Sequence, residues 1–61
     1  MQSTQDTRPL LTPADVAHLV NVSRKTAYRL IERGELEALH VGASVRVRPQ
    51  DLDAYLERSA G

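Results

Sequence analysis

Basic and hydroxyl side chains gather in the middle of the sequence, at a spacing that suits contact with a polyanion. Lys25 and Arg29 are four residues apart, so a helix would carry both on one face. The planar guanidinium of Arg29 can bond O6 and N7 of one guanine, and Lys25 can reach a base or a phosphate. Ser23, Thr26 and the free amides of a helix start suit phosphate oxygens. These residue types allow a DNA-binding surface, and the alternative is an ordinary solvated helix face.

A second basic pair, Arg46 and Arg48, follows the short segment Gly42-Ala43-Ser44. Residues two apart share one face of a strand, so both side chains can reach the minor groove of DNA or its phosphates. Tyr28 can give its hydroxyl to a phosphate or pack as an aromatic ring beside this pair, and its residue type leaves both roles open.

The sequence lacks the residues that other chemistry would need. It contains no cysteine, and its histidines, His18 and His40, have no metal-ligand spacing and no carboxylate cluster beside them, so we expect no metal. No nucleophile and base fall into a pattern that would build a catalytic pocket. The sequence therefore predicts a binding protein that is not an enzyme and holds no cofactor.

Two helices joined by a short turn would position the first basic group. Thr12 is an N-cap candidate followed by proline and aspartate, which predicts a helix over 13–20. Ser23 is a second N-cap candidate, and the run 24–33 has no helix breaker before Gly34. A connection of three residues forces a sharp corner between the helices, which is typical of a helix-turn-helix unit.

From residue 38 onward, apolar residues recur at every second position and no longer at helical spacing. This predicts a hairpin over 39–48 that turns at 42–44, with His40, Arg46 and Arg48 on its wet face. Pro49 ends the strand and opens a third helix over 50–58. The side chains expected to face the core or to fill the helix corner are Val16, Ala17, Val20, Val22, Ala27, Leu30, Ile31, Leu39, Val41, Val45, Val47, Leu52, Tyr55 and Leu56.

The expected fold is mainly α with a β-hairpin: a helix-turn-helix, a two-stranded wing and a C-terminal helix. The 61 residues allow one domain. Residues 1–9 are polar and predict a flexible arm, 10–58 the winged helix-turn-helix domain, and 59–61 a frayed tail. Without cysteine, a signal peptide or an apolar run approaching 18 residues, we expect a cytoplasmic protein that does not enter a membrane.

The charges are unevenly distributed although the sequence is neutral overall, with eight basic and eight acidic side chains. Residues 23–48 carry six basic and three acidic side chains, so the remainder has a matching acidic surplus. Steering by charge depends on the local field, so a neutral total does not exclude DNA. We expect Arg33 to pair with Glu37 or stay solvated. Asp51, Asp53 and Glu57 form either an acidic patch for a partner protein or a solvated face.

Short motifs follow one another in a recognisable order from residue 10 to residue 58. They are LTPADVA from Leu11 to Ala17, Val22-Ser23-Arg24, Thr26, Tyr28-Arg29-Leu30-Ile31, Gly34-Glu35-Leu36, Val41-Gly42, Arg46-Val47, Asp51-Leu52 and Tyr55-Leu56. In this order and spacing the sequence resembles the small excisionase-like, MerR-related winged helix-turn-helix DNA-binding domains of bacteria, phages and integrating elements.

The resemblance implies roles for particular residues. The start and exposed face of the recognition helix would comprise Ser23, Arg24, Lys25, Thr26, Tyr28 and Arg29. Arg46 and the tip 42–44, with Ser44, would form the wing. Wings of this family often carry arginine or lysine beside the glycine, whereas Ala43 and Ser44 are neutral here. Wing contacts are therefore expected to be weaker, or to shift to Arg46 and Arg48.

The resemblance also implies the role of an excisionase, or recombination directionality factor, in a bacterial cell. Such a protein binds repeated sites in an attachment region of double-stranded DNA, packs head to tail, bends the DNA and helps an integrase to excise the element. A domain this small covers little DNA, so useful affinity requires several copies. Two alternatives stay open: a small MerR-like or AlpA-like transcription regulator, and a protein-interaction module whose Lys25, Arg29 and Arg46 meet an acidic protein.

Overall fold

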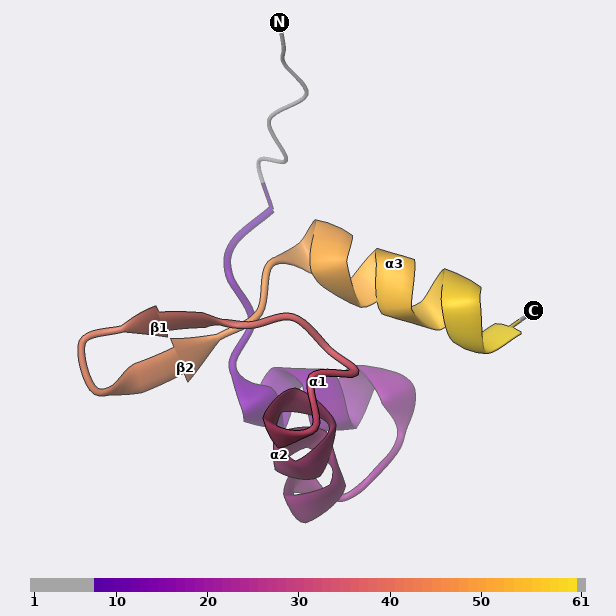
Figure 1. The fold of residues 1–61 in the computed structure, drawn as a ribbon, viewed down its shortest axis with the longest axis horizontal. Coiled ribbons are helices and arrows are strands. Elements are labelled where there is room, and N and C mark those ends of the chain that lie inside the picture. The colour runs from indigo at the N-terminus through magenta and orange to yellow at the C-terminus, as the bar shows by residue number, and fades with distance from the viewer. Residues whose placement is uncertain (1–7, 61) are drawn as a thin grey trace, which may run out of the picture.

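The computed structural model describes residues 8–60 and orders them as two helices, a hairpin and a third helix (Figure 1). The elements are α1 (Pro13–Val20), α2 (Arg24–Glu32), β1 (Leu39–Val41), β2 (Ser44–Arg46) and α3 (Pro49–Ala60). Most of the expected arm, residues 1–7, lies outside the described residues, as does residue 61 of the expected tail. Helix α3 extends two residues beyond the expected end at Arg58, because serine and alanine do not break a helix.

Side-chain caps begin the first two helices, as the sequence predicts. The Thr12 hydroxyl accepts from the Asp15 amide at 3.0 Å, and the Asp15 carboxylate accepts from the Thr12 amide at 3.0 Å. The Ser23 hydroxyl accepts from the Thr26 amide at 3.1 Å. Between the helices, Asn21 has φ 60°, a left-handed conformation that asparagine tolerates. These contacts fix where α1 ends and α2 begins.

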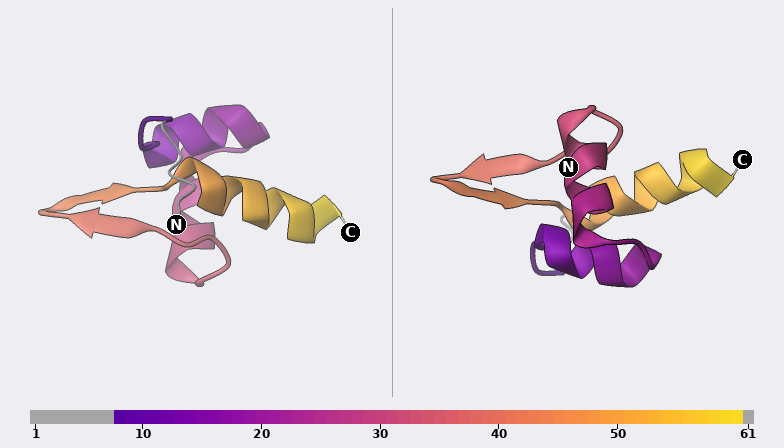
Figure 2. Two further views of the ribbon diagram at one scale, coloured as in Figure 1. Left: turned by 90° about the horizontal axis from the view of Figure 1, so that it is seen from above. Right: turned by 90° about the horizontal axis from the view of Figure 1, so that it is seen from below.

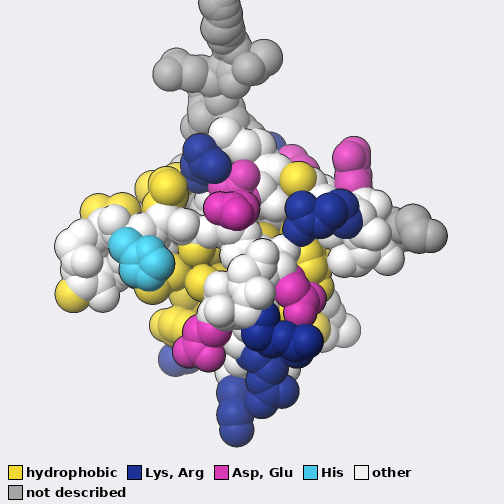
Figure 3. Space-filling view, viewed as in Figure 1, with side chains coloured by type: hydrophobic (Ala, Val, Ile, Leu, Met, Phe, Trp, Pro, Cys, Tyr) yellow, Lys and Arg dark blue, Asp and Glu magenta, His cyan; other side chains and the backbone are white. Residues whose placement is uncertain are grey.

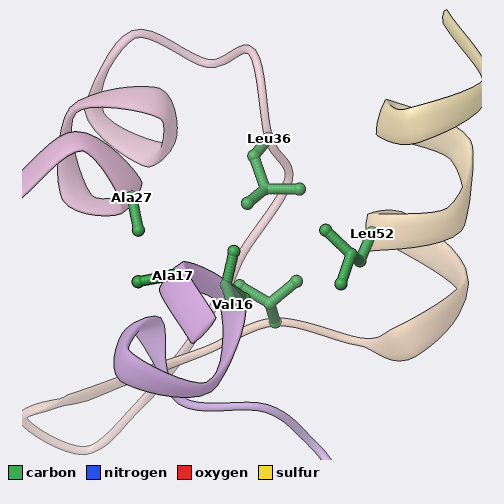
Figure 4. Packing of buried hydrophobic residues seen from close by; sticks show 6 residues of the cluster. Val16, Ala17, Ala27, Leu36 and Leu52 are labelled. Carbon is green, nitrogen blue, oxygen red and sulfur yellow. The ribbon is translucent and has the colours of Figure 1, made fainter. Parts of the chain in front are cut away.

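The core gathers side chains from all three helices, from the loop after α2 and from the residue after β2. Figure 4 shows Ala17 of α1 opposite Ala27 of α2, and small side chains there let the two helices pack closely. Leu36, only 1% exposed, points from the loop after α2 into the space between the helices. Val22 does not fill the helix corner as expected, because 37% of it is exposed. The buried apolar residues are Val16, Ala17, Ala27, Leu36, Val47 and Leu52.

The hairpin of β1 and β2, here called the wing, has a register one residue away from the expected one. The partners are Leu39 with Arg46, His40 with Val45, and Val41 with Ser44. Only Gly42 and Ala43 lie in the turn, so odd-numbered residues of β1 share a face with even-numbered residues of β2. Val41 and Val45 therefore lie on opposite faces, and 55% of Val41 is exposed. The expectation that they share a core face, and that His40 and Arg46 share a wet one, is wrong.

The wing turn and its base explain this register. Gly42 has φ 61° at the first position of a two-residue turn, which is the position glycine takes in a type II′ hairpin turn. At the base, Leu11 and Val47 exchange two backbone hydrogen bonds of 2.8 Å each. The segment ahead of α1 thus pairs with the end of the wing. Figure 2 shows the wing and α3 extending to opposite sides of the helix pair, as in a winged helix-turn-helix.

Candidate nucleic-acid interface

One side of α2 is open to solvent along its whole length. Ala27 is buried and Leu30 and Ile31 are half-buried, so these residues pack α2 against the core. The opposite side consists of exposed residues, which we call the α2 face: Arg24, Lys25, Tyr28, Arg29 and Glu32. With 43% of its surface exposed, Tyr28 lies outside the buried core cluster. Four of these five residues were expected on this face, and Glu32 was not.

The cations of the α2 face are unpaired. Among residues 8–60, the side chains of Arg24, Lys25 and Arg29 have no hydrogen-bond or ion-pair partner. An exposed cation that no carboxylate neutralises keeps its full attraction for a phosphate. The α2 face is therefore available to a polyanion without breaking any contact within the domain.

The other arginines of the domain are engaged. Arg8 lies 2.8 Å from the Asp53 carboxylate, and Arg58 donates to the backbone carbonyl of Glu35 at 2.7 Å. Arg33 pairs with Glu35 at 3.1 Å, so the expected partner Glu37 is wrong. Glu35 lies closer along the chain to the end of α2. Among the described residues, the lysine and arginine side chains without a partner therefore all lie on α2, and the paired arginines lie elsewhere in the domain or at the end of α2.

Arg48 is held by α3 and does not stand free beside Arg46. Its Nε lies 2.6 Å from the Asp51 carboxylate, and this hydrogen bond raises the pKa of Arg48 above its ordinary value. Asp51 and Asp53 are both paired with arginines, so among the described residues the expected acidic patch on α3 keeps only Glu57 without a partner. The Asp51 carboxylate offsets the charge of Arg48, so Arg48 attracts a phosphate less than an unpaired arginine does.

Arg46 lies half-buried on the wing. It donates to the Val45 carbonyl at 2.8 Å, which holds its side chain along the strand. The pKa of Asp15 is lowered first by the hydrogen bond from the Thr12 backbone, then by the Thr12 hydroxyl, with a smaller contribution from Arg46. Arg46 thus lies within electrostatic reach of α1, and Ser44 is exposed near the tip.

The start of α2 adds backbone donors to the α2 face. The Ser23 hydroxyl lies 2.9 Å from that of Thr26 and caps the Thr26 amide. The amides of Arg24 and Lys25 precede it in the first turn, where a helix supplies no acceptor. Such amides favour an anion. Figure 3 shows Lys and Arg side chains gathered over this end of the molecule, at the bottom of the view.

Within residues 8–60, neither a metal site nor a membrane span is found. No three histidine or acidic side chains come together as they would around a metal ion. No helix in this part of the chain has the length and apolar character needed to cross a membrane.

Comparison with known proteins points to the same use of this fold. The sequence model of a family described as helix-turn-helix domain matches residues 10–60. The chain is 44% identical over 59 residues to a Mycobacterium tuberculosis protein named "Putative DNA-binding protein Rv0500A", covering 97% of this chain and 76% of that one. It is 46% identical over 44 residues to the uncharacterized protein YvgK of Bacillus subtilis, covering 72% of this chain and 14% of that protein. No solved structure gives a significant match.

Proposed function

We propose that this chain, a DNA-binding protein that belongs to the helix-turn-helix domain family, inserts α2 into the major groove and lays its wing along the neighbouring backbone. The observation that carries this proposal is the set of three unpaired cations on one exposed side of α2, Arg24, Lys25 and Arg29. Their charge is offset by no contact inside the domain, so binding DNA neutralises them at no structural cost.

Each residue of the interface then has a task. Arg29 reads a guanine through O6 and N7, and Lys25 contacts a base or a phosphate. Ser23, Thr26 and the first amides of α2 hold a phosphate, while Tyr28 offers its hydroxyl to the backbone. Arg46 and Ser44 contact the backbone from the wing. Arg48 contributes least, because Asp51 already holds its charge.

The biological role that we propose is that of an excisionase. The chain binds repeated sites in an attachment region, copies pack head to tail, the DNA bends, and an integrase is directed towards excision. The small size of the domain supports this part of the proposal, because a single α2 covers few base pairs and several copies are needed for useful affinity.

Binding is tested first. In gel shifts on duplexes selected from a randomised pool, Arg29→Ala should relax the preference for one base pair. Arg46→Ala should weaken binding to all sequences alike. The proposed orientation of α2 and wing is wrong if neither change alters binding. If the wild-type protein shifts no duplex even at low salt, DNA binding itself is refuted.

Excision is tested separately. The protein is added to the integrase of its own element and a plasmid that carries the attachment region, and the excised circle is quantified. An excisionase raises the yield of excised circle, and Arg29→Ala loses this effect. DNA binding without any gain in excision contradicts the excisionase role and favours a transcription regulator.

A further inference from the structure

Glu32 is an acidic residue at the C-terminal end of the α2 face, a surface that otherwise attracts phosphate. It is the last residue of α2 and lies one turn beyond Tyr28 and Arg29 on the α2 face. The C-terminal end of a helix carries a partial negative charge, so a carboxylate there does not stabilise α2. Helix stability therefore does not explain an acid at this position.

The Glu32 carboxylate is also unpaired. Within residues 8–60 it has no hydrogen-bond or ion-pair partner, although cations stand three residues before it and next to it. The neighbouring Arg33 instead forms an ion pair with Glu35, with 3.1 Å between the guanidinium and the carboxylate. Glu32 thus stands free on the surface that meets DNA, with both of its oxygens available as acceptors.

The chemistry of a carboxylate limits what it can contact in a major groove. Phosphates repel it, and the acceptor edges of guanine offer it no hydrogen. The amino donors there are cytosine N4 and adenine N6, and the N7 acceptor beside adenine N6 repels the second carboxylate oxygen, so glutamate favours cytosine. We propose that Glu32 determines specificity by accepting a hydrogen bond from a cytosine N4. This inference rests on the proposed docking of α2.

The helix places this contact beside the one made by Arg29. Three residues advance a helix by about 4.5 Å along its axis, and base pairs are spaced by about 3.4 Å. Arg29 and Glu32 therefore reach neighbouring base pairs, one through a guanine and the other through a cytosine. The binding site should contain a guanine with a cytosine contact at the adjacent pair.

The test is selection of binding sites from a randomised duplex pool with wild-type protein, Glu32→Gln and the control Glu57→Gln. Glu57→Gln removes the same charge from the exposed side of α3. The wild-type protein should prefer cytosine at one position by about fivefold or more, the lower end for a base contact. Glu32→Gln should move the preference at that position alone to adenine, because glutamine bonds adenine N6 and N7. Glu57→Gln should leave the motif unchanged.

Three results decide the matter. A change from cytosine to adenine at one position supports the inference. If Glu32→Gln raises affinity by the same factor for every sequence, or leaves the motif unchanged, Glu32 is a solvated charge and the inference is wrong. If the wild-type protein selects no motif at all, the proposed function fails and the inference with it. Matched urea unfolding of the variants confirms that the fold is intact.

Discussion

Replacing Lys25 by glutamine should flatten the salt dependence of DNA binding. Lys25 is exposed, stands in the first turn of α2 and has no partner among the described residues, so its charge is free to neutralise a phosphate. A neutralised phosphate releases counterions, and each such contact adds about 0.9 to the slope of log affinity against log salt. Glutamine is one atom shorter than lysine but stays polar, and the substitution removes the charge on which this contribution depends.

The magnitude follows from the cations that face DNA. Arg29 is assigned to a base, so Arg24, Lys25 and Arg46 supply about three phosphate contacts, which gives a slope of about −2.7. With two contacts the slope becomes about −1.8. Over a fourfold rise in salt, the wild-type protein then loses about 40-fold in affinity and the variant about 12-fold.

Fluorescence anisotropy on one labelled duplex, titrated at several salt concentrations, measures both slopes. The matched control is Arg48→Gln, which removes the same charge from an arginine that Asp51 already holds at 2.6 Å. The control should keep the wild-type slope. Equal slopes for Lys25→Gln and wild type, or an equal flattening by Arg48→Gln, would refute the reasoning that unpaired cations define the interface.

Three further predictions concern stability. Gly34→Ala should destabilise the fold by about 1–2 kcal/mol in urea unfolding, because Gly34 has φ 76° and an added methyl group meets no atom, so only backbone strain acts. Leu36→Ala should lower the free energy of unfolding by about 2–5 kcal/mol, because this leucine is 1% exposed and alanine leaves a cavity. A decrease below about 1 kcal/mol would mean that the loop after α2 repacks around the smaller side chain. The pKa of Asp15 is lowered from its ordinary 3.8. The ionised carboxylate therefore contributes to the free energy of unfolding above pH 3.8, and this contribution is lost as the pH falls through the pKa of Asp15 in the folded state. Asp15→Asn should therefore show a shallower acid loss of stability, and identical acid profiles would contradict this.

The helices were predictable because local chemistry determines them. Thr12 and Ser23 cap the two helix starts, and Gly34 takes the left-handed position after α2. Hairpin register depends instead on how many residues the turn consumes. Alternating valines at 41 and 45 fit a three-residue turn as well as the observed turn of two, so the sequence pattern led to the wrong faces. Leu36 lies in no periodic segment, and no sequence signal marks it as a core residue.

The α2 face was predictable from helical projection, but whether each charged side chain is paired or unpaired was not. Whether an arginine is free depends on carboxylates that are distant in sequence, as with Arg8 and Asp53, 45 residues apart. Arg46 and Arg48 look equivalent in the sequence, yet one bonds a neighbouring carbonyl and the other an aspartate of α3. Glu32 entered the charge count of residues 23–48 but was not assigned to a face of the helix. Its spacing of three residues from Arg29 is the signal that would have placed it on the α2 face.

The bridge between Leu11 and Val47 has a consequence for the order of folding. It joins the segment before α1 to the residue after β2, 36 residues later, whereas α1 and α2 are neighbours along the chain and need only a three-residue turn to meet. Local contacts close small loops and form early, while distant ones wait for the chain between them to become ordered. The Leu11–Val47 bridge at the base of the wing should therefore form last in folding and break first in unfolding. In hydrogen exchange, the amides of Leu11 and Val47 should open together, at a lower free energy than those of the helix pair.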